Sequence, residues 1–302
     1  MSRPPAFDMA LLGLAVVAVS TSAPLIRVAD APSLAVAFWR NALALPVLGA
    51  VVLLDRRSRR EVRGLDARER RLSAVAGLFL AAHFATWVPS LSFTSVASSV
   101  ALVATQPVWA ALIARWRGDH VPRLAWWGIG SAMAGTVVLT GVDLSIAPRA
   151  LFGDLLALVG GALAAAYVTV GADVRRTVST TVYATSCYAT AAIALLVVCG
   201  VGRQPLAGYD GGTWLALVAI VAGPQLLGHT LVNRVLRTTS PMVVSVAILF
   251  EIVGSALLAW VAFDEVPPAS AIPAGVLIAA GVVLVVRASP TEPAVAGAPA
   301  ME

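Results

Sequence analysis

Polar side chains recur at helical spacing inside otherwise apolar stretches of the chain. Gln225, His229 and Asn233 are four residues apart, so on a helix they would form one stripe along a single face. Amide and imidazole groups are costly to leave unbonded in an apolar medium, so this stripe should face protein or water rather than lipid. It could hold helices together through hydrogen bonds, or it could bind a small polar solute.

The same pattern occurs about 146 residues earlier in the chain. Residues 76–83 read A-G-L-F-L-A-A-H, and residues 222–229 read A-G-P-Q-L-L-G-H. The chain therefore contains a tandem duplication with a period longer than that of any solenoid repeat. The equivalent pairs in this register are His83 with His229 and Trp87 with Asn233.

Two ionisable side chains also fall within apolar stretches. Glu251 is the one acidic residue deep inside such a stretch, and the neutral Gln106 is its equivalent in the first copy. A buried carboxylate there could carry a proton, or it could pair with a histidine or a hydroxyl in a packing role. Arg40 lies about 10 Å from the end of its stretch. Its side chain could extend to the surface, or its guanidinium could bind a substrate carboxylate bidentately.

Aromatic residues complete the candidate site. Trp87, Trp109 and Tyr167 are predicted to lie deep, where they would line a cavity or pack in the core. The predicted substrate-binding residues are His83, Trp87, Tyr167, Gln225, His229, Asn233 and Arg40, and the predicted ion-coupling residue is Glu251.

The elements that must position these residues are membrane-spanning helices. Of the 302 residues, 59% are hydrophobic and 12% are charged, and the mean hydropathy is +0.87. Soluble domains are about 45–50% apolar and about 25% charged. Apolar windows long enough to cross a bilayer lie near residues 9–27, 33–54, 73–92, 95–114, 124–142, 152–171, 180–200, 213–233, 241–262 and 269–287. The alternation of a transmembrane barrel is missing, so the prediction is an all-α membrane protein with ten transmembrane helices.

The charges predict the orientation of these helices. All 21 basic residues are arginine, and with a cytoplasmic N-terminus only Arg27, Arg149 and Arg203 would lie outside. The positive-inside rule then puts both termini in the cytoplasm. The arginine-rich loop 55–71 could instead bind anionic lipid or nucleic acid, but its interspersed acids and flanking helices favour a topology signal. No nucleic-acid partner is expected.

The arginines that flank the first copy are replaced by apolar residues and tryptophan in the second, as expected for a repeat inserted upside down. The predicted units are an inverted pair of five-helix repeats, 9–142 and 152–287, followed by a disordered tail at 288–302. Small residues near Gly128, Gly160 and Gly275 could support close helix crossings in the bundle or a homodimer.

Several chemistries have no support in the sequence. There is no metal-ligand spacing and no nucleotide-binding loop, so no cofactor, no metal and no catalytic residue is predicted. Cys187 and Cys199 fall on one predicted helix, too far apart to bond to each other, and are expected to pack as small apolar residues.

These features together resemble the EamA family of the drug/metabolite transporter superfamily. The resemblance rests on the two repeats, the G-D-L-L-A-L segment at 153–158, Arg40, and L-F-E at 249–251 followed by D-E at 264–265. It covers residues 9 to 287 and implies a ten-helix inverted-repeat carrier of the bacterial inner membrane, commonly an exporter of amino acids or other small metabolites.

The predicted function is therefore secondary transport of a small polar metabolite by alternating access, in the direction of export. The substrate would bind among the central polar residues, with the lipid bilayer as the surrounding partner. One alternative is proton-coupled efflux of hydrophobic cations, for which a buried carboxylate and aromatic walls would suffice. A second is an intramembrane enzyme that acts on a lipid, with histidine and glutamate as acid and base.

Overall fold

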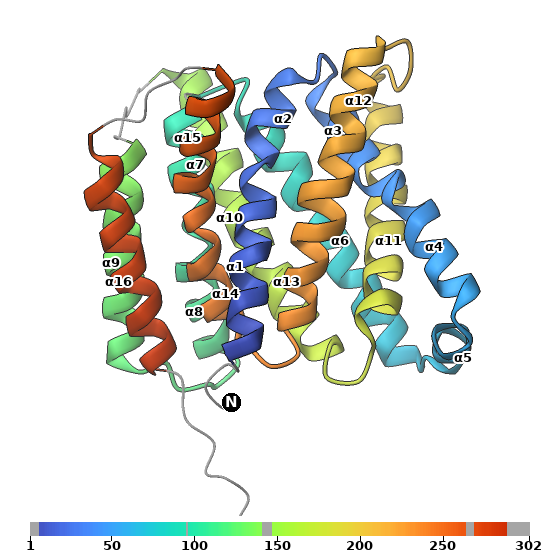
Figure 1. Cartoon of the computed structure of the whole chain (residues 1–302), viewed down its shortest axis with the longest axis horizontal. Coiled ribbons are helices and arrows are strands. Elements are labelled where there is room, and N and C mark those ends of the chain that lie inside the picture. Colours follow the sequence, from blue (N-terminus) through green and yellow to red (C-terminus); the bar gives the residue numbers. More distant parts are fainter. Residues whose placement is uncertain (1–5, 95, 141–146, 264–268, 289–302) are drawn as a thin grey trace, which may run out of the picture.

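The computed structural model describes residues 6–94, 96–140, 147–263 and 269–288. Within these ranges every regular element is a helix, and the helices pack side by side as a bundle (Figure 1). Helices occupy all the predicted windows. The predicted disordered tail lies outside the described residues, apart from Ala288, which ends the last helix.

The first half of the chain contains nine helices in its described residues. They are α1 (Ala6–Ser20), α2 (Ser22–Val28), α3 (Ser33–Ala42), α4 (Ala44–Leu54), α5 (Arg56–Gly64), α6 (Ala67–Ser90), α7 (Val96–Val103), α8 (Gln106–Trp116) and α9 (Arg123–Thr140). The second half contains α10 (Pro148–Val174), α11 (Thr180–Val201), α12 (Gly211–Ile220), η1 (Val221–His229), α13 (Thr230–Val235), α14 (Pro241–Ile248), α15 (Phe250–Phe263) and α16 (Ala271–Ala288).

Eight helical stretches of the described chain are long and apolar enough to cross a membrane. They are Ala6–Val28, Ser33–Leu54, Ala67–Ser90, Pro148–Val174, Thr180–Val201, Gly211–Val235, Pro241–Leu258 and Ala271–Ala288. The windows predicted at 95–114 and 124–142 fold as α7 with α8 and as α9, which are not among these eight. The total of ten crossings stays a prediction.

Prolines interrupt several of the long stretches. A proline has no N–H to bond the carbonyl four residues earlier, and its ring clashes with that carbonyl. In four places a helix ends four residues before a proline, at the residue whose carbonyl the proline cannot bond. These pairs are Ser20 with Pro24, Ala42 with Pro46, Val103 with Pro107, and Ile220 with Pro224. The first of these breaks falls at Thr21, between α1 and α2.

After Ile220 the chain does not return to an α-helix at once. It continues as η1, a π-helix over Val221–His229, before α13 begins. The regular α-helix assumed for the polar stripe of Gln225, His229 and Asn233 is thus wrong over its first half, because the proline at 224 disrupts the α-helical ladder. π-Helical turns are rare and occur often at functional sites.

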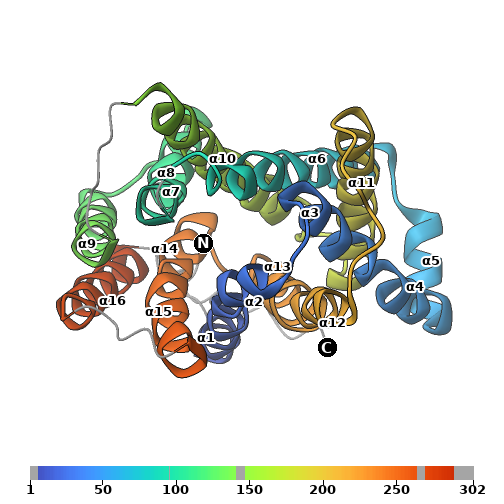
Figure 2. The same cartoon turned by 90° about the horizontal axis from the view of Figure 1, so that it is seen from above.

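Close helix crossings depend on glycine. A Cβ on Gly128 of α9 would lie 2.8 Å from the carbonyl oxygen of Gly281 in α16, and one on Gly281 would lie 2.6 Å from that of Gly128. These two helices lie side by side at one edge of the molecule (Figure 2). A Cβ on Gly130 or on Gly275 would meet no atom of another described helix within 4 Å. Gly128 therefore serves a crossing within the bundle.

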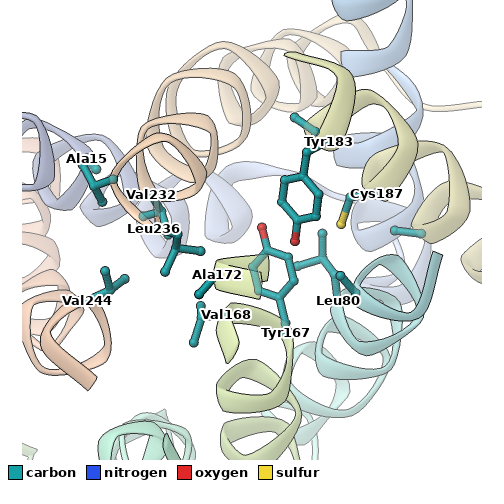
Figure 3. Close-up of a cluster of buried hydrophobic side chains, with 14 of the residues drawn as sticks. Ala15, Leu80, Tyr167, Val168, Ala172, Tyr183, Cys187, Val232, Leu236 and Val244 are labelled. Carbon is teal, nitrogen blue, oxygen red and sulfur yellow. The ribbon is translucent and has the colours of Figure 1, made fainter. Parts of the chain in front are cut away.

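The core between α6, α10 and α11 is aromatic. Tyr167 and Tyr183 point toward each other there, with Leu80 and Cys187 beside them (Figure 3). Cys187 and Cys199 are both free and buried, as expected for packing residues.

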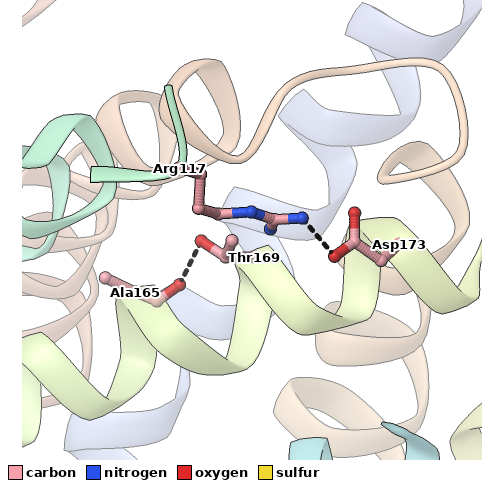
Figure 4. A network of polar contacts seen from close by, with 4 residues as sticks. All are labelled: Arg117, Ala165, Thr169 and Asp173. Atoms are coloured by element: carbon pink, nitrogen blue, oxygen red, sulfur yellow. Dashed lines mark hydrogen bonds and ion pairs between the residues drawn. The ribbon is translucent and has the colours of Figure 1, made fainter. Parts of the chain in front are cut away.

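An ion pair connects the two halves of the chain. Arg117, which follows α8, donates to Asp173 of α10 at 2.7 Å, next to Thr169 (Figure 4). Both side chains are partly exposed, so the pair contributes at most about 1 kcal/mol.

Candidate functional site

Arg40 lies inside the bundle and does not reach the surface. Its side chain is only 1% exposed, its Nε donates to Oε1 of Gln225 at 2.9 Å, and its guanidinium lies 4.1 Å from the ring centroid of Phe84. The surface-directed alternative is therefore wrong. Arg40 lies on the face of α3 that packs against α6 and η1. There the Gln225 side chain accepts a hydrogen bond from the guanidinium, and the Phe84 ring interacts with its charge.

Gln225 holds three helices together. Its Oε1 accepts from Arg40, its Nε2 donates to Oδ1 of Asn41 at 3.1 Å, and its backbone carbonyl accepts from the Tyr188 hydroxyl at 3.3 Å. Gln225 itself is fully buried. Both ends of this predicted substrate-binding amide are thus engaged by the protein, in a way that orients the Arg40 guanidinium.

The repeat-related histidines both lie against Phe84. Its ring centroid is 5.0 Å from that of His83 and 5.9 Å from that of His229. Nδ1 of His83 lies 2.9 Å from the carbonyl oxygen of Gly160, so this nitrogen carries the proton. His83 also stacks on Trp87 at 5.7 Å with an interplanar angle of 11°.

Tyr167 connects this cluster to Asn233. The Tyr167 hydroxyl donates to Oδ1 of Asn233 at 2.6 Å, and the tyrosine ring lies 6.5 Å from that of His229. Asn233 and Tyr167 are both buried. The structure thus brings all seven predicted substrate-binding residues into one network, with Phe84 near its centre.

Four polar nitrogens of this network are buried and have no hydrogen-bond partner among the described residues. They are Nη2 of Arg40, Nε1 of Trp87, Nδ1 of His229 and Nδ2 of Asn233. The arginine, tryptophan and asparagine nitrogens can only donate hydrogen bonds. Buried polar groups in proteins are nearly always bonded to protein or to water, so these donors are available to an acceptor from outside the chain.

Glu251 begins a helix at a discontinuity. It lies in the first turn of α15, directly after the break at Leu249, and is partly buried. No ion pair within 4 Å joins Glu251 to Arg40 in the described chain.

The break beside Glu251 has an equivalent in the first half. There α7 ends at Val103 and α8 begins at Gln106, whose Nε2 donates to Oγ of Ser245 at 2.9 Å. The second break has no proline. There the backbone N–H of Ile252 bonds the Leu249 carbonyl, three residues back, at 3.2 Å. Interrupted helices at corresponding positions of two halves are typical of binding sites in carriers.

Sequence reasoning missed several contributors to the network. Phe84 and Asn41 are adjacent to predicted residues, but neither lies in the four-residue pattern that singled those out. Tyr188 contributes a hydroxyl from α11. Trp109, which was predicted to lie deep, donates from Nε1 to Thr105 Oγ1 at 3.0 Å and is therefore already bonded. Within the described ranges, no group of three or more histidine, cysteine or acidic side chains could hold a metal ion.

Comparisons with known proteins agree with this architecture. A model of the EamA-like transporter family matches residues 7–141 and again residues 151–287. A solved structure described as "Crystal structure of protein" is 24% identical, with a TM-score of 0.73 over 92% of this chain and 95% of that chain. This similarity shows that the two proteins share a fold. A comparison with curated protein sequences gives no significant match.

Proposed function

The chain belongs to the EamA-like transporter family, and we propose that it is a secondary carrier that exports amino acids or related small metabolites bearing a carboxylate. Membership makes it a membrane transporter of the drug/metabolite transporter superfamily, and its eight candidate spans make it a multi-pass membrane protein. We propose in addition that the substrate bears a carboxylate, that transport is outward, and that it is coupled to an ion.

The observation that carries the substrate class is the set of unpaired donors around Arg40. Nη2 of Arg40, Nε1 of Trp87 and Nδ2 of Asn233 are buried donors that lack acceptors in the described chain. A substrate carboxylate has two oxygens that accept hydrogen bonds, and a guanidinium matches its geometry. Such an anion would neutralise Arg40 and satisfy the neighbouring donors at the same time.

The proposed coupling ion is a proton carried by Glu251. An amino acid has an ammonium group as well as a carboxylate, and the chain offers the partly buried carboxylate of Glu251, in the first turn of α15, as well as the buried Arg40. With its carboxylate on Arg40, the substrate would direct its ammonium toward Glu251 and displace the proton there. Substrate and proton would thus bind in turn, which supports export driven by proton entry.

The proposed architecture is an inverted pair of five-helix repeats that work by alternating access. α1 begins at one end of the bundle and α10 at the opposite end (Figure 1), as the two directions of such a repeat require. Five arginines of α5 lie at the end where α1 begins, which by the positive-inside rule supports a cytoplasmic N-terminus in a bacterial inner membrane. Reporter fusions at both termini test this orientation, and an external signal from either would overturn it.

Export of hydrophobic cations fits the interior less well. Phe84, Trp87 and Tyr167 would provide aromatic walls for a cation. However, the Arg40 guanidinium already covers the Phe84 ring at 4.1 Å, and its charge would repel a second cation at that position. The buried cation therefore favours a substrate with a negative group.

The experiment is counterflow in liposomes that contain the purified protein. A panel of amino acids is compared with the matching amines, which lack the carboxylate, and with the matching acids, which lack the ammonium. We expect exchange of amino acids and none of the amines. Exchange of amines at the same rate as amino acids would overturn the carboxylate proposal.

The coupling is tested in the same liposomes with an imposed pH gradient. The wild type should accumulate the amino acid against its gradient, whereas Glu251→Gln should exchange it without accumulation. Ser73→Ala is the control, because the Ser73 hydroxyl is buried and unpaired within the described chain and lies outside the network. Accumulation that survives in Glu251→Gln would remove Glu251 from the coupling mechanism.

A further inference from the structure

Two aspartate–threonine hydrogen bonds lie away from the central network. Asp8, in the first turn of α1, accepts from the Thr238 hydroxyl at 2.5 Å. Asp154, near the start of α10, accepts from the Thr94 hydroxyl at 2.6 Å. In both bonds the carboxylate belongs to the first long helix of one half of the chain. The hydroxyl belongs to the turn that follows α13 or α6 in the other half.

The two bonds are related by the duplication. Asp8 and Asp154 are separated by the same spacing of about 146 residues that relates the two histidines. Thr94 is equivalent to Thr239, and the hydroxyl that reaches Asp8 comes from Thr238, one residue earlier. The neighbouring Thr239 hydroxyl is buried and has no partner among the described residues. The same device is thus present in both halves, with a shift of one residue.

The bonds lie at opposite ends of the bundle. α1 begins at the end where α13 finishes, and α10 begins at the other end, where α6 finishes (Figure 1). Each bond connects the two halves of the chain, because α1 and α6 precede the link between them and α10 and α13 follow it. Motion of one half against the other at either end would therefore stretch one of these bonds.

We propose that Asp8–Thr238 and Asp154–Thr94 are paired latches, one at each mouth of the transporter, and that opening a mouth requires its latch to break. This inference rests on the proposed alternating access. Both latches are formed in this structure, so both mouths are held. A hydrogen bond to an ionised carboxylate is stronger than one between neutral groups, which suits a contact that must hold until the substrate is bound.

The two latches differ in how tightly they are packed. A Cβ on Gly153 would lie 2.8 Å from Cβ of Phe93 and from the backbone nitrogen of Thr94, so α10 approaches this turn as closely as glycine allows. The equivalent residue beside Asp8 is Phe7, whose side chain is 65% exposed. Asp8 is itself buried, at 7% exposure. The latch of Asp154 thus depends on close backbone contact, and that of Asp8 on burial of the carboxylate.

The test measures access to the interior and needs no substrate. Trp87→Cys is introduced as a reporter after Cys187 and Cys199 are changed to alanine, and a membrane-impermeant maleimide is applied to vesicles of either orientation. Thr238→Val should raise the labelling rate about tenfold from the side where α1 begins. Thr94→Val should raise it from the opposite side. Thr239→Val is the matched control and should leave both rates unchanged.

The converse experiment closes the latches covalently. The pair Asp8→Cys with Thr238→Cys, joined by a short bifunctional reagent, should block labelling from its own side alone, and Asp154→Cys with Thr94→Cys should block the other side. If the valine variants raise labelling from neither side, or the cross-links leave it unchanged, the bonds are fixed anchors and the proposal fails. A failure of amino-acid counterflow alone would overturn the substrate and leave the latches standing.

Discussion

Arg40 and Arg175 are both buried, at 1% and 2% exposure, yet their surroundings differ. Arg175 donates from Nε to the Asn233 carbonyl at 2.8 Å, from Nη1 to the Val178 carbonyl, and from Nη2 to Thr180 Oγ1 at 2.6 Å. Arg40 donates from Nε to Gln225, while its Nη2 has no partner in the described part of the chain.

This difference separates a structural arginine from one that we propose binds the substrate. Arg175 follows α10 directly, and its hydrogen bonds connect α10 to the end of α13 and the start of α11. A buried guanidinium whose three nitrogens all donate to the protein is anchored by the fold. Arg40 retains a free donor beside an aromatic face, so its burial is incompletely compensated until an anion binds.

The largest expected effect comes from replacing each arginine by lysine. Lysine keeps the charge but is a single point donor, so Arg40→Lys cannot bond Gln225 and a substrate carboxylate together. We expect its initial rate of amino-acid counterflow to fall about 100-fold or more, as for the loss of one partner of a buried charge pair. Arg175→Lys should stay within about threefold of the wild type per folded molecule. Equal losses in the two variants would remove the distinction.

For stability we expect the opposite: replacing Arg175 should destabilise the fold more than replacing Arg40. Arg175→Met removes three hydrogen bonds, which at about 0.6 kcal/mol each in membrane proteins lowers the free energy of unfolding by about 2 kcal/mol. Arg40→Met removes an uncompensated buried donor together with its hydrogen bond, and the two effects oppose each other. The free energy of unfolding should therefore change by about 1 kcal/mol or less. Unfolding in detergent, followed by circular dichroism, measures both. A larger loss in Arg40→Met would show that Arg40, too, mainly holds the fold.

The two arginines also mark where sequence reasoning succeeds and where it stops. A four-residue period is a local pattern, and it led us to expect that the stripe of Gln225, His229 and Asn233 faces protein or water; Gln225 and Asn233 are buried in the structure, and His229 is partly buried. The environment of Arg40 depends on Gln225, which is 185 residues away, and no local pattern encodes which face of α3 packs. Arg175 was expected in an inner loop because it follows an apolar stretch at the predicted cytoplasmic end, whereas the structure buries its side chain.

The irregular helices were harder still to predict. Pro224 indicates that a helix is disturbed, but whether the chain kinks or widens into η1 depends on what packs around it. The break at Leu249 has no proline to signal it, and its equivalent in the first half does. Symmetry between the halves is therefore a better guide to this break than residue type.

A substitution can give the Arg40 guanidinium a second hydrogen-bonding partner within the protein, as Arg175 already has. Gln225→Glu places a carboxylate 2.9 Å from the Arg40 Nε, where it should pair with the guanidinium and compete with the substrate. We expect the half-saturating amino-acid concentration to rise about tenfold, since hydrogen bonds to charged groups contribute about 1.5–3 kcal/mol. Gln106→Glu is the control, because Gln106 bonds Ser245 instead, and it should shift the concentration by about twofold or less. Unaltered affinity in Gln225→Glu would mean that the substrate does not use Arg40.

The smallest expected effect concerns a neutral donor, and it tests whether the free nitrogens act as a set. Trp87→Phe keeps an aromatic ring to stack on His83 but removes the unpaired indole N–H. A neutral hydrogen bond contributes about 1 kcal/mol, so the half-saturating concentration should rise about fivefold. Trp109→Phe is the matched control, because its indole already donates to Thr105 and should not contact the substrate. If both variants weaken binding equally, ring packing matters and the indole donor does not. A loss confined to Trp87→Phe would extend the contrast between the two arginines to a neutral group, because a donor left free inside the bundle would again be one that the substrate uses.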